Sequence, residues 1–188
     1  MEKQVVIIGA GVAGMESATR LSELGFHVTL VEKKEEMGGH VKKWGFLFPN
    51  ARPAYEILNA LRPDVEDFVD TRLNCEVESI KSENNIFRIS LSTGDKLKAD
   101  AILLTTGFDL FDARIKEEYG YGIYENVITA AELEEMFMNK IPIRTAAGKI
   151  PKRIGFVHCV GSRDEKVGNE YCSKICCVTG VKQAMKIR

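Results

Sequence analysis

The apolar positions near the beginning of the chain follow a strand pattern, then a helix pattern, then a strand pattern again. Residues 4–8 form a short β-branched apolar run, which is typical of a strand buried in a parallel sheet. From residue 12 to residue 24 apolar side chains recur every three to four positions, and Gly25 stands where a helix C-cap belongs. This helical face consists of Val12, Met15, Ala18, Leu21 and Leu24. Residues 27–31 form a second apolar run that ends at Glu32, so the order predicts the opening of a Rossmann-like unit.

The middle of the chain changes to short alternating segments. A short helix is expected from Pro53 to Leu61, with Pro63 just beyond its end. Turn signals at Asn84-Asn85 and Thr93-Gly94-Asp95 then separate three segments of alternating polarity. These segments, Leu73–Ile80, Ile86–Leu91 and Lys96–Ala99, predict an antiparallel β-meander. A further buried strand is expected from Asp100 to Leu104.

The last third of the chain predicts two helices and one strand. A helix is expected to begin at Thr129, because Thr129 and Glu132 have the spacing of a capping box. Its apolar face is formed by Leu133, Met136 and Phe137. Residues 141–152 contain two prolines and a glycine and are expected to be a linker. A strand over Arg153–Val157 and a helix from about Ser173 follow.

Three glycines between the first strand and the first helix indicate a dinucleotide-binding site. Gly9, Gly11 and Gly14 form G-x-G-x-x-G, in which the glycines allow a tight turn, a close approach to a pyrophosphate, and close helix–strand packing. The N-terminus of the helix favours the phosphates. Glu32 follows Gly9 by 23 residues, where a carboxylate can accept hydrogen bonds from a ribose diol and disfavours a 2′-phosphate. This motif by itself does not separate FAD from NAD.

Two further motifs carry a resemblance to a known class of flavoproteins. Glu32 is followed by Gly38-Gly39, giving E-x5-G-G, and the last strand of the meander region ends in Thr105-Thr106-Gly107. Together these motifs resemble the two-dinucleotide-binding-domain flavoproteins related to thioredoxin and glutathione reductases. The resemblance implies an α/β fold with a Rossmann-like FAD-binding domain, made of a parallel sheet plus the meander, and the start of a second domain. The FAD-binding residues that it implies are Gly9, Gly11, Val12, Ala13, Gly14, Glu32, Lys33, Gly38, Gly39, Val77, Thr105, Thr106 and Gly107.

Four of the five cysteines lie within nineteen residues of one another. Cys159, Cys172, Cys176 and Cys177 give the pattern C-x12-C-x3-C-C, which supplies one thiolate for each iron of a cubane cluster. The last two are expected in the first turn of a helix, whose positive end favours thiolates. Cys159 is expected at the end of a strand. The spacing alone leaves structural zinc, a redox disulfide and inert thiols open, and Cys75 is expected to be a core thiol.

The cysteine segment also carries a more specific resemblance. The stretch from Cys159 through Cys177, with 106–112, 119–122 and 126–129, resembles the A subunit of heterodisulfide reductase; similar subunits occur in the quinone-interacting oxidoreductase complexes of sulfate reducers. The resemblance implies that the four cysteines hold a [4Fe–4S] cluster near the flavin. His158 stands where glutamine is expected, and an ordinary hydrogen bond at a strand end is anticipated for it. The domains expected are residues 1–145, binding FAD, and 146–188, the incomplete start of a second nucleotide-type domain with the cysteine motif.

Composition and charge restrict the partners that we expect. The net charge is −1, with 45% hydrophobic and 28% charged residues, which gives no electrostatic case for nucleic acid or an anionic membrane. No apolar run reaches the roughly 20 residues of a transmembrane helix. The chain begins almost directly in a strand, without the pattern of a secretory leader, so a cytoplasmic location is expected.

The resulting expectation is an FAD-dependent electron-transfer subunit of a soluble heterodisulfide-reductase-like complex. Its expected partners are other subunits of that complex, including a polypeptide that supplies the rest of the flavin module. No acid–base or nucleophilic catalytic group is expected. Two alternatives remain: a truncated, non-catalytic assembly module, and an NAD(H)-binding protein with structural zinc or a redox disulfide.

Overall fold

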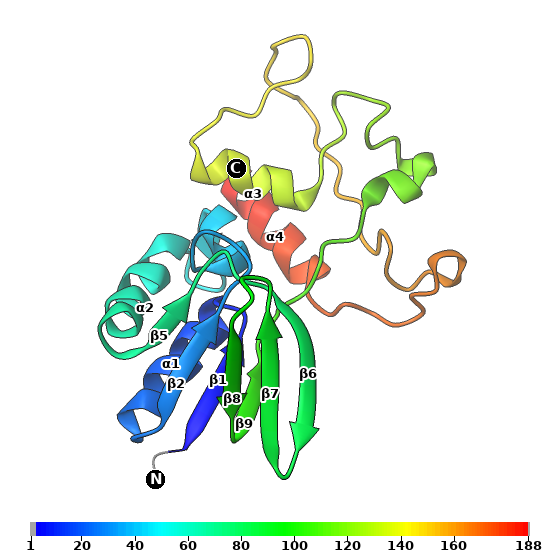
Figure 1. Cartoon of the computed structure of the whole chain (residues 1–188). Helices are drawn as coiled ribbons and strands as arrows, with labels where there is room; N and C mark the ends of the chain where they lie inside the picture. Colours follow the sequence, from blue (N-terminus) through cyan, green and yellow to red (C-terminus); the bar gives the residue numbers. More distant parts are fainter. Residues whose placement is uncertain (1–2, 188) are drawn as a thin grey trace. The chain divides into compact units, whose positions relative to one another are not determined.

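The two apolar runs at the beginning of the chain become neighbouring parallel strands. In the computed structural model, which describes residues 3–187, Val5 of β1 pairs with Val28 of β2 (Figure 1). The sheet has the order β5-β2-β1-β9, and its three pairings are all parallel. Its strands are β1 (Gln4–Ile8), β2 (His27–Val31), β5 (Asp70–Arg72) and β9 (Ala101–Leu104). A strand, a helix and a second strand that follow one another in the sequence thus form part of a parallel sheet. Continuous apolar runs such as these predict that both faces of the sheet are covered.

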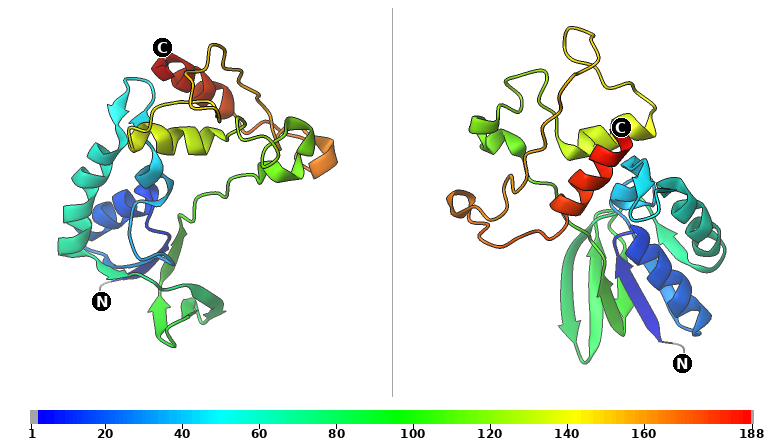
Figure 2. Two further views of the ribbon diagram at one scale, coloured as in Figure 1. Left: turned by 90° about the horizontal axis from the view of Figure 1, so that it is seen from above. Right: turned by 180° about the vertical axis from the view of Figure 1, so that it is seen from behind.

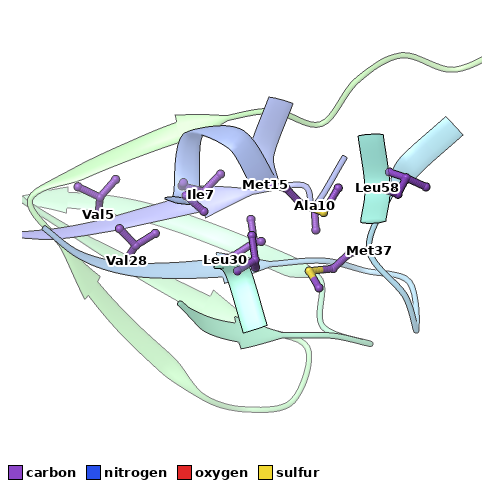
Figure 3. Close-up of a cluster of buried hydrophobic side chains, with 10 residues drawn as sticks. Val5, Ile7, Ala10, Met15, Val28, Leu30, Met37 and Leu58 are labelled. Carbon is purple, nitrogen blue, oxygen red and sulfur yellow. The ribbon is translucent and has the colours of Figure 1, made fainter. Parts of the chain in front are cut away.

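Two helices cover one face of this sheet. They are α1 (Val12–Glu23) and α2 (Ala54–Phe68), and the view from behind in Figure 2 shows α1 lying against the sheet. Val5 and Ile7 of β1 point to this face, together with Met15 of α1 and Leu58 of α2, as Figure 3 shows. Because side chains alternate along a strand, the residues between them point to the opposite face.

The opposite face of the sheet is covered by the antiparallel meander. The meander consists of β6 (Val77–Glu83), β7 (Ile86–Leu91) and β8 (Lys96–Ala99). Val6 and Val31 of the sheet form a second core cluster with Ile89 and Leu91 of β7. Cys75 is buried in the same cluster, as expected for a core thiol. The turn between β6 and β7 uses the predicted Asn84-Asn85 pair, in which both residues have positive φ, as a two-residue hairpin requires.

Contacts divide the chain into two compact units. The first comprises residues up to Lys42 together with Ala54–Phe108, and contains the sheet, both helices and the meander. The second comprises Lys43–Pro53 together with the residues from Asp109 onward. The elements not yet named are η1 (Gly39–Lys43), β3 (Phe46–Leu47), β4 (Arg52–Pro53), η2 (Ala113–Ile115), η3 (Glu117–Tyr119), α3 (Ala130–Met138), η4 (Glu165–Val167) and α4 (Cys176–Ile187). The domain boundary after residue 145 stays a prediction.

The second unit is held together by the packing of α3 on α4. Gln183 of α4 is fully buried, and its Nε2 donates to the carbonyl of Ala130 at 2.7 Å and to Glu134 Oε1 at 3.0 Å. Lys182 forms an ion pair with the same carboxylate and donates to the carbonyl of Phe46. The predicted capping box of Thr129 and Glu132 begins α3.

Several element boundaries differ from those that the sequence predicts. The helix expected to end near Leu61 continues through Pro63 to Phe68. Leu58 and Val65 lie seven residues apart on one face and are both buried in the core. Burying two such side chains is worth about 3–5 kcal/mol, which offsets the roughly 3 kcal/mol cost of proline inside a helix. Leu24, assigned to the apolar face of α1, is exposed, because that helix ends at Glu23.

One predicted strand is shifted and another is absent. The first strand of the meander, expected over Leu73–Ile80, lies at Val77–Glu83, and ahead of it the N–H of Cys75 donates to the carbonyl of Glu32. No strand forms over residues 153–157, where Ile154 and Val157 are exposed. A strand needs a hydrogen-bonding partner, and this segment pairs with none of the strands among residues 3–187.

Candidate functional site

The glycine-rich loop after β1 is closed by contacts that only glycine permits. Gly9 has a φ of +104°, and a Cβ added there would lie 2.5 Å from the carbonyl oxygen of Thr105. A Cβ on Gly14 would lie 1.9 Å from the carbonyl oxygen of Gly9. These two glycines therefore set the tight turn and bring α1 close to β1.

Gly11 has a different environment. A Cβ added to it would meet no atom within 4 Å, and its φ of −72° is ordinary for any residue. It is the N-cap of α1, whose first turn has no acidic residue and no side-chain cap. The backbone N–H groups of Val12 and Ala13 have no partner inside the helix, because the first N–H groups of an α-helix lack a preceding turn to accept them. Gly11 thus borders open space at a helix end suited to phosphate.

Glu32 secures the glycine loop from the end of β2. Its side chain is buried, and Oε2 accepts the backbone N–H of Ala10 at 2.7 Å, while Oε1 accepts that of Lys34 at 3.0 Å. Each carboxylate oxygen offers about two acceptor positions, so capacity remains for a ribose hydroxyl. Lys33 beside it is exposed.

The Gly38-Gly39 pair lies directly against the glycine loop. The N–H of Gly38 donates to the carbonyl of Ala10 at 2.8 Å. A Cβ on Gly39 would lie 3.2 Å from the Cα of Gly11. Both glycines have positive φ, so the structure brings together two motifs that are separate in the sequence.

The end of β9 completes this group of loops. The Thr105 hydroxyl donates to the carbonyl of Gly9 at 2.7 Å, and its N–H donates to the carbonyl of Ile8 at 2.9 Å. Thr105 therefore has a bonding role in this loop. Thr106 and Gly107 are exposed, and a Cβ on Gly107 would meet no atom within 4 Å.

Two residues of this region were missed from the sequence. A ring nitrogen of His40 hydrogen-bonds to the carbonyl of Phe108 at 2.7 Å, and the two rings stack with centroids 4.9 Å apart. This contact joins the segment after Gly39 to the segment after Gly107, and no sequence spacing signals it.

Val77, assigned to the FAD site, is half-buried at the start of β6 and packs on the second core cluster.

In the second unit, the twelve residues between Cys159 and Cys172 form a small hairpin. The N–H of Arg163 donates to the carbonyl of Tyr171 at 3.0 Å, and Asp164 forms an antiparallel bridge with Asn169. The Ser162 hydroxyl donates to the same Tyr171 carbonyl and accepts the N–H of Ser173. The hairpin brings the two ends of a long spacer together.

The hairpin is tied to the rest of the second unit by a buried lysine. Lys116 Nζ forms ion pairs with Asp164 at 2.6 Å and with Glu118 at 2.8 Å. The lysine hydrogen bond lowers the pKa of Asp164, and the same pairs raise the pKa of Lys116 above its ordinary range. Gly161 is buried against the ring of Phe111, where a Cβ would lie 2.2 Å from a ring carbon.

The four clustered cysteines act on one another electrostatically. The pKa of Cys176 is lowered, chiefly because its sulfur accepts the backbone N–H of Cys159, with further hydrogen bonds from Ser173 and Cys177. The pKa of Cys177 is raised, chiefly because its thiol donates to Cys176, and negative charge on Cys159 and Cys172 raises it further. The N–H of Lys174 donates to the sulfur of Cys172 at 3.3 Å. All five cysteines of the chain are free thiols.

Two details differ from the predicted geometry of this segment. Cys159 lies in a turn with a φ of +61°, not at a strand end, and α4 begins at Cys176 rather than at Ser173. Cys176 and Cys177 nevertheless occupy the first turn of α4, as predicted. His158 does not terminate a strand. Its ring nitrogen lies with the sulfurs of Cys176 and Cys177 in a group whose ligand atoms are all within 4.8 Å of one another.

The sequence match agrees with this arrangement of loops. A model of the family described as pyridine nucleotide-disulphide oxidoreductase matches residues 3–142. The chain belongs to this family. Its fold is the Rossmann-like FAD-binding fold of these oxidoreductases, as predicted. None of the helices in residues 3–187 is long and apolar enough to cross a membrane.

Curated relatives cover the whole chain. It is 31% identical to the A subunit of H(2)/formate:CoB-CoM heterodisulfide,ferredoxin reductase from Methanococcus maripaludis, and 32% identical to the iron-sulfur A subunit of CoB–CoM heterodisulfide reductase from Methanocaldococcus jannaschii. Both matches include 100% of this chain and 42% of the relative, so the chain spans less than half of their length. The alignments run over 274 residues, whereas the chain has 188, so the relatives carry residues inside the matched span that have no counterpart here.

Solved structures agree on the fold. Thioredoxin reductase from T. acidophilum has a TM-score of 0.52 and 26% identity, over 60% of this chain and 38% of that one. L-proline dehydrogenase from P. horikoshii has a TM-score of 0.51 and 21% identity, over 61% of this chain and 25% of that one, and shows the fold alone.

Proposed function

We propose that this chain is an electron-transfer module that binds FAD in its first unit and a [4Fe–4S] cluster in its second. The observation that carries the proposal is the position of Cys176 and Cys177 together in the first turn of α4, where the backbone N–H of Cys159 donates to the sulfur of Cys176. Four thiolates are the ligand set of a cubane cluster. When bound, the two groups supply two-electron and one-electron redox chemistry.

The residues of the first unit fit FAD. Gly11 and Gly107 border open space, where an added Cβ would meet nothing, while Gly9 and Gly14 are packed tightly. The first pair leaves room for a ligand to approach the backbone, and the second pair fixes the loop. Glu32 orients the loop through Ala10 and retains acceptor capacity. Val12, Ala13, Lys33, Gly38, Gly39, Val77, Thr105 and Thr106 complete the proposed FAD site.

The residues of the second unit fit an anionic cluster. The sulfur of Cys176 accepts hydrogen bonds from the N–H of Cys159 and from Ser173, which stabilise negative charge there. The first turn of α4 contributes the positive end of its dipole. The hairpin between Cys159 and Cys172, pinned by Lys116, holds the two other thiols in place. The ligands proposed are Cys159, Cys172, Cys176 and Cys177.

The partners proposed are other subunits of a heterodisulfide-reductase-like complex. The relatives from M. maripaludis and M. jannaschii are named as A subunits of such reductases. Since this chain spans 42% of each, a further polypeptide or further residues would supply the rest of the flavin module. Within this larger assembly, we propose that residues 1–145 form the FAD-binding domain and that a second domain begins at residue 146.

An anaerobic reductive titration tests the proposal. The chain, reconstituted with FAD, iron and sulfide, is titrated with dithionite while flavin and cluster absorbance are followed. About three electron equivalents per chain are expected, two for the flavin and one for the cluster. A Cys176→Ser variant is expected to accept about two, because only the flavin remains. An uptake of about two by the unchanged chain would contradict the cluster, and an uptake of about one would contradict the flavin.

A further inference from the structure

His158 lies at the cysteine site although no spacing motif includes it. Its ring nitrogen and the sulfurs of Cys176 and Cys177 are all within 4.8 Å of one another. Among residues 3–187, the described hydrogen bonds and ion pairs include none to this imidazole. The ring is therefore available to a group that the thiols bind.

The position of the imidazole depends on a glycine inside α4. Gly180 is buried, and a Cβ added to it would lie 2.3 Å from Cε1 and 3.1 Å from Nε2 of His158. Glycine in the middle of a helix costs about 1 kcal/mol relative to alanine. Here it leaves a recess, one turn after the cysteine pair, in which the ring of His158 packs against the helix.

The two neighbouring thiols differ in the hydrogen bonds that they receive. Cys176 accepts from Cys159, Ser173 and Cys177, whereas Cys177 donates to Cys176 and has the ring nitrogen of His158 within 4.8 Å of its own sulfur. Four cysteines already fill the four iron positions of a cubane cluster. A nitrogen donor beside them then acts on ligand sulfur rather than on iron.

We propose that His158 is a positioning residue of the cluster site, which donates an imidazole N–H hydrogen bond to the sulfur of Cys177 and raises the reduction potential of the bound cluster. Hydrogen bonds to cluster sulfurs are a recognised determinant of potential. The inference rests on the proposed function, because it requires the cluster, and it adds a residue outside the four-cysteine motif.

The test is an EPR-monitored redox titration of the reconstituted chain. His158→Ala is expected to keep its iron and to have a lower midpoint potential. Gly180→Ala is expected to shift the potential in the same direction, because its Cβ displaces the ring without removing any donor. The matched controls are His27→Ala, an exposed histidine of the first unit, and Gly155→Ala, whose Cβ would meet no atom within 4 Å. Neither control is expected to shift it.

Iron and sulfide assays separate the outcomes. A full cluster with an unchanged potential in both His158→Ala and Gly180→Ala would overturn the inference and leave the proposed function standing. Loss of iron from His158→Ala alone would make His158 a ligand and would also overturn it. Absence of iron from the unchanged chain would overturn both the inference and the cluster.

Discussion

The carboxylate of Glu32 accepts the backbone N–H of Ala10 at 2.7 Å, across 22 residues of sequence. This bond connects the end of β2 to the loop that follows β1. The carbonyl of Ala10 accepts in turn from Gly38, so one residue of the glycine motif holds both the acidic residue and the Gly38-Gly39 pair. The glycine motif, the acidic residue and the Gly38-Gly39 pair are separate in the sequence, and hydrogen bonds join them in the structure.

Replacing Glu32 by Ala is expected to weaken both folding and FAD binding. The buried N–H of Ala10 would lose its acceptor, which costs about 1–3 kcal/mol, and a ribose acceptor would be lost, which is expected to raise the Kd for FAD about tenfold or more. Urea unfolding and a flavin fluorescence titration measure the two effects. Glu35→Ala removes the same charge from an exposed neighbour, and equal losses in both variants would contradict the role of Glu32.

Substitution by alanine is expected to lower the stability of the fold at Gly14 and the affinity for FAD at Gly11. Gly14→Ala places a Cβ 1.9 Å from the carbonyl oxygen of Gly9, and such overpacking typically costs about 1–3 kcal/mol or more. Gly11→Ala meets no protein atom, and its poorer helix cap is offset by the smaller conformational freedom of the unfolded chain, so the free energy of unfolding without ligand is expected to change by less than about 1 kcal/mol. FAD affinity is nevertheless expected to fall, because the Cβ occupies the approach to the phosphates. Unimpaired FAD affinity in Gly11→Ala would show that the ligand does not pass this loop.

The ion pairs of Lys116 predict a pH dependence of stability. Lys116 lowers the pKa of Asp164 and of Glu118, so their contribution is fully present above the ordinary carboxyl pKa of about 4. It is lost as the pH falls through the lowered pKa values of the folded state. Because the pKa of Lys116 is raised, its contribution is present below the ordinary lysine pKa of about 10.4 and is lost as the pH rises through the raised value.

Urea unfolding between about pH 2 and pH 7 measures this dependence. In Lys116→Met the carboxylates lose their partner, so the slope of stability with pH below about pH 4 is expected to flatten. Lys152→Met, at an exposed position, provides the control and is expected to keep the slope of the unchanged chain. The same slope in both variants would mean that the lysine does not pair with Asp164 in solution.

The first unit was largely predictable because local signals and long-range packing agree there. Alternation in β1 assigns Val5 and Ile7 to one face and Val6 to the other, and both faces are covered. The helix α2 was predicted too short because Pro63 reads as a stop, whereas burial of Val65 outweighs the lost hydrogen bond. In α2, tertiary burial therefore outweighed local propensity.

The cysteine site was less predictable, because its geometry depends on contacts between residues far apart in the sequence. The motif identifies the four cysteines, but the hairpin that joins Cys159 to Cys172 depends on Asp164 meeting Lys116, 48 residues earlier. The position of His158 depends on Gly180, which carries no motif. The strand assigned to residues 153–157 failed because no neighbouring strand of the described chain offers it hydrogen bonds. Contacts between distant residues of this kind leave no periodic signal in a single sequence.

The most direct test of the account is the iron, sulfide and flavin content of the chain purified and reconstituted without oxygen. The account predicts about four irons and about one FAD per chain, and loss of the iron in Cys177→Ser with the flavin retained. Cys75→Ala, which removes the buried core thiol, is expected to keep about four irons. Zinc in place of iron, or an iron content that Cys177→Ser leaves unchanged, would contradict the account.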